Sequence, residues 1–279
     1  MHAKSFPFGV RLIGFSPAET AQITAALAQA PAGGPAYTCL LEASLQEPDF
    51  LIGNGDDLKA MAALVAMSPG PVQPGLVIGQ APADVAFPQL PRPIDPQRLC
   101  ALMAKLAEER ADAVARLSAR GLPVVPERRR TLRLDLDLTD PLEHVARRRG
   151  PVDGAILILD QRGALRDHIA KLLGTVAGGN ARAVEWTDSP VAVYRLCEET
   201  PVALVLINTS VPDIDPYEVC ARIKAAPEAT RIAVVLLVGP TAPYDPARGA
   251  QAGVRGILDK PVADRHLLGA LKRLLSLPY

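Results

Sequence analysis

The feature that most constrains the fold is a strict alternation of apolar runs and amphipathic stretches over the second half of the chain. The runs with strand character are AILIL (155–159), ARAVEW (181–186), VALVLIN (202–208), IAVVLLV (232–238) and GILDKP (256–261). A helical stretch follows each run, and IAVVLLV is apolar on both sides, as in a central strand. This pattern predicts a parallel sheet with helices on both faces, so residues 152–279 are expected to form one α/β domain.

The first part of the chain repeats the same order more faintly. Its strand-like runs are VRLIGF (10–15), AYTCLLEA (36–43), DFLIGN (49–54) and GLVIGQ (75–80), with helical stretches between them. The segment APADVAFPQ (81–89) is short and proline-rich, so the fourth helix of this copy is expected to be reduced or absent. Residues 1–107 are therefore predicted to be a second, more degraded copy of the domain.

Residues 108–151 are predicted to be a structured linker. The last helix of the first copy runs on past its domain, with an apolar stripe near heptad spacing at Leu99, Met103, Leu106, Ala113 and Leu117. Such a stripe can pair with a second copy, but we expect one this short to pack on its own domain. TLRLDLDL (131–138) alternates like a strand and is a candidate to cap the open sheet edge of the first copy, and Asp140-Pro141 opens a short helix.

Charge and cysteine content exclude several classes of protein. The chain has 30 basic and 30 acidic residues, so no global field draws it to nucleic acid or anionic lipid. Its 4 cysteines are far apart and favour neither a zinc site nor a disulfide framework. The first residues do not resemble a secretion signal, and no apolar run reaches the length of a membrane span. We therefore expect a soluble, cytoplasmic protein without membrane or nucleic-acid partners.

The run LVLINTSVPDIDPYEVC (204–220) has the form of a buried strand that ends on Asn208 and leads through a proline-bearing loop into a helix. Together with Lys260-Pro261 after the last strand, it resembles the active-site region of a response-regulator (CheY-like) receiver domain. The resemblance covers residues 155–275 well and 9–106 weakly. It implies, for each copy, a flavodoxin-like sheet of about five strands in the order 2-1-3-4-5, with the site at the carboxyl ends of the strands.

The resemblance also implies where the site residues should lie. A working receiver has an acidic pair after the first strand, a phosphoacceptor aspartate after the third, Ser or Thr after the fourth, and lysine before proline after the fifth. The matching positions of the second copy, with the aromatic switch position last, hold Asp160, Gln161, Asn208, Val238, Lys260 and Ile257. A neutral carboxamide neither attacks phosphorus nor holds magnesium well. The pattern indicates a degenerate phosphorylation site.

The first copy departs further from the family pattern. Gly14 and Phe15 stand at the acidic pair, Asn54 at the acceptor, and Arg92 in place of the lysine, while Gly79 or Gln80 takes the hydroxyl position. No cation site can be assembled from these residues. We expect no metal, no cofactor and no enzymatic activity.

The favoured hypothesis is a phosphorylation-independent scaffold or adaptor of tandem pseudo-receiver domains in a bacterial two-component pathway. Its partner would be another signalling protein (a histidine kinase, a response regulator or an output enzyme), or a second copy in a homodimer. Receivers generally use the face of the fourth helix, fifth strand and fifth helix for such contacts, which points to Arg255, Lys272 and Arg273.

Two alternatives remain open. The first is a nucleotide sensor that binds a cyclic dinucleotide, either in the old crevice or at linker arginines able to grip phosphates. Those arginines are Arg128, Arg129, Arg130, Arg133, Arg147, Arg148 and Arg149. The second is a residual phosphoryl-accepting regulator that uses an off-position acid such as Asp213 or Asp215, although in-line attack requires close placement.

Overall fold

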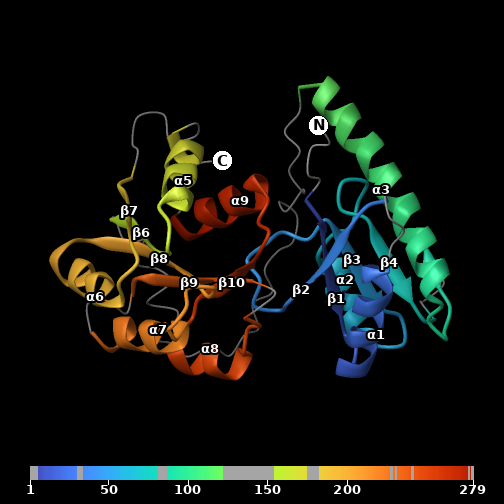
Figure 1. The fold of residues 1–279 in the computed structure, drawn as a ribbon. Coiled ribbons are helices and arrows are strands. Elements are labelled where there is room, and N and C mark those ends of the chain that lie inside the picture. The colour runs from blue at the N-terminus through green and yellow to red at the C-terminus, as the bar shows by residue number, and fades with distance from the viewer. Residues whose placement is uncertain are drawn as a thin grey trace. The chain divides into compact units, whose positions relative to one another are not determined.

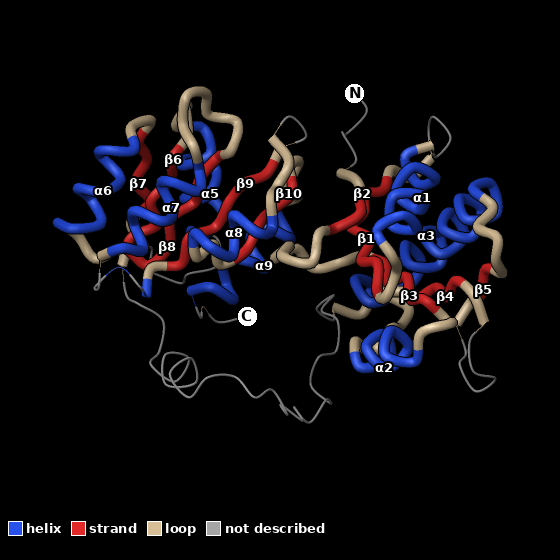
Figure 2. The backbone as a smooth tube through the Cα atoms, turned by 90° about the horizontal axis from the view of Figure 1, so that it is seen from below, coloured by secondary structure: helices blue, strands red, loops and turns tan. Residues whose placement is uncertain are grey.

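The structure is a computed structural model. It describes residues 6–29, 34–80, 87–121, 154–174, 182–226, 229, 231–239, 242–275 and 277. The chain divides into two compact units: unit 1 contains residues 1–42 and 47–135, and unit 2 contains residues 43–46 and 136–279. Each unit has its own sheet (Figures 1 and 2). The expected domain boundaries near residues 107 and 152 stay predictions.

Unit 1 is built around a parallel sheet. Its strands are β1 (Phe8–Ile13), β2 (Tyr37–Leu40), β3 (Phe50–Asn54), β4 (Gly75–Ile78) and β5 (Gln89–Leu90), and its described helices are α1 (Pro17–Ala28), α2 (Leu58–Ala66) and α3 (Pro96–Ala119). The sheet has five strands in the order β2-β1-β3-β4-β5, the predicted 2-1-3-4-5. The described residues between β4 and β5 contain no helix. Residues 81–86, where the reduced fourth helix was expected, lie outside the described residues.

Helices cover both faces of the unit 1 sheet. α1 and α3 pack on one face, where Ile23 and Leu99 share a core with Phe50, and α2 packs on the other face through Leu64 (Figure 2). The apolar stripe of α3 joins this core at Leu99, Met103 and Leu106, so the first part of the stripe packs on its own domain, as expected.

The long helix α3 is also fixed by a buried ion pair. Arg110 donates to Asp49 Oδ1 (2.6 Å) and to the carbonyl of Val72 (2.9 Å), and its guanidinium lies over the ring of Phe8. The other oxygen of Asp49 accepts from the backbone N–H of Gly9 at 2.9 Å. Because Asp49 is 3% exposed, its charge depends on these partners.

Unit 2 has the same architecture. Its strands are β6 (Ala155–Leu159), β7 (Val184–Thr187), β8 (Val202–Asn208), β9 (Ala233–Val238) and β10 (Gly256–Asp259), and its described helices are α5 (Ala164–Gly174), α6 (Pro190–Glu199), α7 (Pro216–Ala225), α8 (Pro246–Ala252) and α9 (Asp264–Leu275). The five strands are parallel, in the order β10-β9-β8-β6-β7, which is again 2-1-3-4-5 counted within the unit. Both units are therefore flavodoxin-like.

Apolar side chains fill both sides of the unit 2 sheet. Val193, Cys220 and Ala252 bring α6, α7 and α8 onto one face, and Ile169 and Leu271 bring α5 and α9 onto the other (Figure 1). All residues of β8 before its last are buried, as expected for a strand that helices cover on both sides. This leaves the carboxyl ends of the strands as the place where polar side chains can meet.

Local signals agree with these elements. Asp245 caps α8 by accepting from the backbone N–H groups of Ala247 and Arg248, and Gly253 ends the helix with φ +77°. The expected linker strand and short helix, including the proposed edge cap of the first copy, lie outside the described residues.

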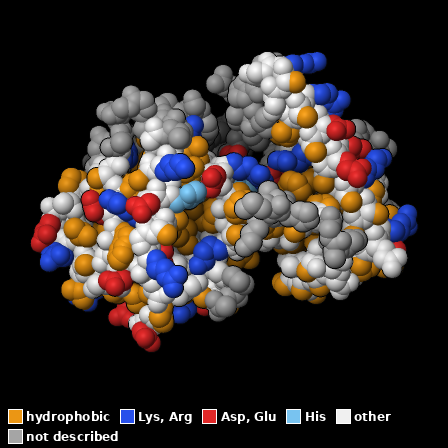
Figure 3. Space-filling model, turned by 45° about the horizontal axis from the view of Figure 1, so that its top comes forward, with side chains coloured by type: hydrophobic (Ala, Val, Ile, Leu, Met, Phe, Trp, Pro, Cys, Tyr) orange, Lys and Arg blue, Asp and Glu red, His pale blue; other side chains and the backbone are white. Residues whose placement is uncertain are grey.

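The surface and helix lengths carry two further findings. No helix in the described part of the chain has both the length and the hydrophobicity to cross a membrane. On the face drawn in Figure 3, acidic and basic side chains are interspersed, in keeping with the balanced charge of the chain.

Candidate functional site

The site of unit 2 forms where three strands end. Asp160 follows β6, Asn208 is the last residue of β8, and Lys260 follows β10. Parallel strands present their carboxyl ends at one edge, so residues that are about 50 positions apart in sequence meet there. The peptide bond between Lys260 and Pro261 is cis.

Asn208 joins the other two residues through its carboxamide. Its Nδ2 donates to Asp160 Oδ1 at 2.7 Å, and its Oδ1 accepts from Lys260 Nζ at 2.5 Å. An amide can donate on one side and accept on the other, whereas an ionised carboxylate only accepts, and the two charged neighbours fix which end of the amide faces which. The asparagine therefore has a bridging role that an aspartate could not fill.

Lys260 has a second partner that sequence reasoning missed. Its ammonium donates to Ser210 Oγ at 2.9 Å, and the backbone N–H of Ser210 donates to Asn208 Oδ1 at 3.0 Å. Burial lowers the pKa of Lys260, and the charge of Asp160 opposes that shift. Gly239 leaves room here, because a Cβ at this position would lie 3.0 Å from Ser210 Oγ and 3.2 Å from Lys260 Cε. No sequence pattern singled out Ser210.

The remaining predicted positions of unit 2 are Gln161, Val238 and Ile257. Gln161 is exposed, and its backbone N–H donates to Asp160 Oδ1 at 2.8 Å. Val238 is buried at the end of β9 with 7% exposure, and Ile257 is fully buried in β10. Neither can supply the hydroxyl or the mobile aromatic ring of a working receiver.

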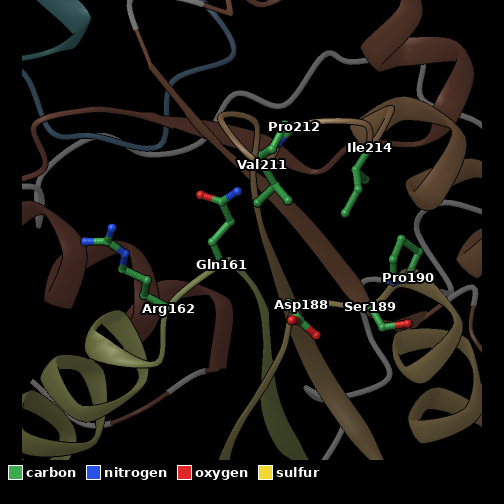
Figure 4. Close-up of a pocket in the computed structure, with 8 residues that line it drawn as sticks. All are labelled: Gln161, Arg162, Asp188, Ser189, Pro190, Val211, Pro212 and Ile214. Atoms are coloured by element: carbon green, nitrogen blue, oxygen red, sulfur yellow. The ribbon is translucent and has the colours of Figure 1, made fainter.

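A cavity of 680 Å³ opens beside this bridge, between the loops that follow β6, β7 and β8. Its lining residues are Gln161, Arg162, Asp188, Ser189, Pro190, Val211, Pro212 and Ile214. The Arg162 side chain extends away from the apolar side chains of Val211 and Ile214 (Figure 4). One wall of the cavity is thus apolar. The charged residues of the lining are Arg162 and Asp188.

Unit 1 repeats the carboxamide bridge. Asn54 Nδ2 donates to the carbonyl of Gly14 at 2.8 Å, and Asn54 Oδ1 accepts from Arg92 at 2.9 Å and from the backbone N–H of Asp56 at 3.1 Å. The amide again links the loop after the first strand to the cation after the fifth. As in unit 2, the residue two positions after the asparagine contacts that cation, because Arg92 Nε donates to Asp56 Oδ2 at 2.7 Å.

Two acids hold Arg92 in unit 1. Besides Asp56, Glu19 of α1 pairs with the guanidinium. The pKa of Glu19 is lowered, first by hydrogen bonds from Ser16 and then by Arg92, and the pKa of Asp56 is lowered by the backbone N–H of Gln80 and then by Arg92. Sequence reasoning missed both acids, although Ser16-x-x-Glu19 is a capping-box signature.

Gly14 shows why no acid can stand at this position in unit 1. Its φ is +76°, and an added Cβ would lie 2.2 Å from Ala60 Cβ. Any side chain there would strain the backbone and collide with α2. Phe15 packs against the core of the unit. The acidic pair of the family thus has no counterpart here.

The magnesium ion that the family resemblance implies does not fit either unit. In unit 2 the one carboxylate of the site, Asp160, accepts from an amide N–H group, and the Lys260 ammonium lies against the neighbouring amide oxygen. Magnesium requires a near-octahedral shell rich in oxygen ligands. Nowhere among the described residues do three or more His, Cys, Asp or Glu gather in a way that could hold a metal ion.

The other predicted residues lie apart from this site. Arg255 directly precedes β10, and Lys272 lies within α9. Arg273, also in α9, donates to the carbonyl of Leu45. The linker arginines from Arg128 to Arg149 lie outside the described residues.

The two off-position acids lie in the loop after β8. Asp215 caps α7 by accepting from the backbone N–H of Tyr217 at 3.0 Å and pairs with Arg248 at 2.5 Å. Burial raises its pKa, but these hydrogen bonds lower it by more. Asp213 is exposed, with φ +59°.

The comparisons with known proteins concern the second part of the chain. Residues 156–272 match the family model of the response regulator receiver domain. Fimbriae Z protein of Salmonella typhimurium is 28% identical over 122 residues, covering 44% of this chain and 56% of that protein. Protein PilG of Pseudomonas aeruginosa is 26% identical over 117 residues, covering 42% and 84%. Response regulator PleD of Caulobacter vibrioides is 28% identical over 87 residues, covering 31% and 19%. The chain thus spans about half of Fimbriae Z protein and less of PleD.

Solved structures of receiver domains also align with part of the chain. Chemotaxis response regulator CheY4 of Vibrio cholerae is 18% identical, with a TM-score of 0.38, over 44% of this chain and 98% of that one. The receiver domain of sensor histidine kinase PA1611 from Pseudomonas aeruginosa is 20% identical, with a TM-score of 0.38, over 46% and 98%. Residues 156–272 are thus similar to the response regulator receiver domain, and this similarity covers less than half of the chain.

Proposed function

We propose that this protein is a phosphorylation-independent adaptor of tandem pseudo-receiver domains, acting by protein–protein contact in a two-component pathway. The observation that carries this proposal is the carboxamide bridge, made by Asn208 in unit 2 and by Asn54 in unit 1. In both units an amide takes the place of the phosphoacceptor and satisfies both of its neighbours.

The bridge supports a constant conformation. A phosphoryl group acts as a switch when its new oxygens recruit the lysine and the neighbouring loop. Here Lys260 already contacts Asn208 and Ser210, and Arg92 already contacts two carboxylates and Asn54. The loops are therefore held by internal hydrogen bonds, and no chemical step is needed to set them.

The similarity of residues 156–272 to receiver domains supports a class of partner. Receiver domains of two-component systems interact with other signalling proteins, so we propose a histidine kinase, a response regulator or an output enzyme as the partner. A homodimer is a further form that the same surfaces could support.

The alternatives have weaker support. A cyclic dinucleotide is a polyanion, whereas the described lining of the cavity contains one arginine, Arg162, and one aspartate, Asp188. Asp215 caps α7 and pairs with Arg248, so its carboxylate already has partners. Asp213 is therefore the off-position acid to test.

The test is a titration of the purified full chain with magnesium chloride and beryllofluoride, a phosphoryl mimic, followed by amide NMR. We expect no saturable shift at Asp160, Asn208 or Lys260. The Gln161→Asp, Asn208→Asp double variant restores two of the missing acids and serves as the positive control, because it should respond to magnesium.

A second readout addresses the off-position acid. Treatment with acetyl phosphate followed by intact mass measurement should add no phosphoryl group to the wild type. A mass increase that the Asp213→Asn variant loses would support the residual regulator instead. Saturable shifts around Asp160 and Lys260 in the wild type would overturn the adaptor proposal.

A further inference from the structure

The outer edge of β10 in unit 2 is paired with a short segment, Ala43–Gln46, which belongs to the same unit. Ser44 forms a parallel bridge with Ile257. The backbone N–H of Leu45 donates to the carbonyl of Ile257 at 2.8 Å, and the N–H of Ile257 donates to the carbonyl of Ala43 at 3.0 Å. β10 is the last strand in the sheet order, so these bonds satisfy groups that an edge strand leaves open.

Side chains add to this pairing. Ser44 Oγ donates to Asp259 Oδ2 at 2.9 Å, and Gln46 Nε2 donates to the carbonyl of Asp259 at 2.8 Å. Arg273 of α9 donates to the carbonyl of Leu45. Ser44 and Gln46 are 8% and 6% exposed, so the contact is dry rather than a loose surface encounter.

The edge is also shaped for the segment. An added Cβ on Gly256 would lie 2.6 Å from Leu45 Cγ and 3.0 Å from the carbonyl oxygen of Ala43. Ala43 and Leu45 pack against the two cores on opposite faces of the sheet. A glycine in a strand often marks the close approach of another backbone, which is the case here.

We propose that the β10 edge of unit 2 is a docking site for an extended peptide and that Ala43–Gln46 is its resident occupant. Strand addition uses main-chain hydrogen bonds for affinity and side-chain pockets for specificity. This edge offers main-chain bonds at Ile257, a carboxylate at Asp259 for a hydroxyl, and a side-chain-free surface at Gly256. A partner that uses this edge must displace the segment. The inference does not depend on the proposed adaptor function.

The first experiment measures amide hydrogen exchange by NMR in the full chain. The Gly256→Val variant keeps a strand-forming residue in β10 but excludes the segment, and the Ser44→Ala, Gln46→Ala variant weakens the segment while leaving the edge intact. We expect the Ile257 amide to exchange at least about tenfold faster in both variants. The Lys260 amide, which donates to Val238 on the other side of β10, should not change.

Two additions make this test decisive. Gln97→Ala, at an exposed position of α3, is the matched control and should leave the Ile257 rate unaltered. A synthetic peptide with the sequence of residues 41–48, LEASLQEP, should then shift the Ile257 and Asp259 signals of the Ser44→Ala, Gln46→Ala variant in a saturable way.

Three results would overturn the inference. The first is an Ile257 amide in the wild type that exchanges as fast as in Gly256→Val. The second is an absence of saturable shifts with the peptide. The third is a wild-type dimer in light scattering whose dilution exposes Ile257, since the occupant would then be a second copy.

Discussion

Replacement of Asn208 by aspartate removes the donor half of the bridge in unit 2. The wild-type amide Nδ2 lies 2.7 Å from Asp160 Oδ1, so in Asn208→Asp a carboxylate oxygen faces another carboxylate oxygen. Hydrogen bonds to charged groups contribute about 1.5–3 kcal/mol, and this one is lost. Repulsion between the two charges is about 4 kcal/mol at 4 Å with an effective dielectric constant of 20.

The new charge also gains a partner. Lys260 Nζ lies 2.5 Å from Asn208 Oδ1, so an aspartate gains an attraction of about the same size as the repulsion. The two Coulomb effects largely cancel, and the lost hydrogen bond sets the net effect. We expect Asn208→Asp to lower the free energy of unfolding of unit 2 by about 1.5–3 kcal/mol at neutral pH without magnesium.

The pH dependence has a definite sign. In the variant, protonation of one of the two carboxyl groups restores a hydrogen-bond donor between them, which raises the pKa of that group, so the folded variant binds a proton that the unfolded chain has already released. Stability of the variant therefore falls as pH rises through this raised pKa, and the difference from wild type should shrink toward pH 5. Magnesium should reduce the difference at neutral pH, because it screens both acids.

The assay is urea unfolding followed by the fluorescence of Trp186. It is the single tryptophan of the chain and lies in β7, so its signal reports on unit 2. The control is the exchanged pair Asp160→Asn, Asn208→Asp, which again places one amide against one carboxylate and should regain most of the stability. A loss below about 0.5 kcal/mol in Asn208→Asp, or one that grows as pH falls, would refute the bridging role.

Two further predictions concern unit 1. The pKa values of Glu19 and Asp56 are lowered, so the contribution of these acids to stability is present above about pH 4 and is lost as pH falls through the folded pKa values. Arg92→Met removes a partner that lowers both pKa values. Acid unfolding followed by circular dichroism should therefore be less steep in this variant than in wild type. Removing one partner of the buried Asp49–Arg110 pair, as in Arg110→Met, should cost about 3–5 kcal/mol in urea unfolding, and a loss near zero would show that Asp49 does not depend on this partner.

Much of the fold could be predicted because its signals are local. Apolar runs such as VALVLIN mark buried strands, and Asp245 and Gly253 mark the ends of α8, whatever lies elsewhere in the chain. The strand order came from the family resemblance rather than from these patterns. The positions of Asn208 and Lys260 at the strand ends followed from that resemblance in the same way.

Long-range contacts of residues outside the family pattern could not be predicted. In the sequence, nothing distinguishes Ser210 from other loop serines. Its role depends on a hydrogen bond from Lys260, which lies 50 positions later. The sequence around Glu19 indicates a capping residue, but it does not indicate the contact with Arg92, which lies 73 positions away. The run AYTCLLEA (36–43) was expected to be one strand, yet β2 ends at Leu40, and Ala43 belongs to a segment that pairs with β10.

The sequence by itself therefore determined that two α/β sheets form and that both lack the acceptor carboxylate, because hydrophobic periodicity and residue identity are properties of short stretches. Only the tertiary structure decided what the replacements do. The sheet determines which loops lie side by side and therefore which groups can form hydrogen bonds. The bridging amides of Asn54 and Asn208 and the pairing at the edge of β10 thus depend on the folded arrangement of the chain.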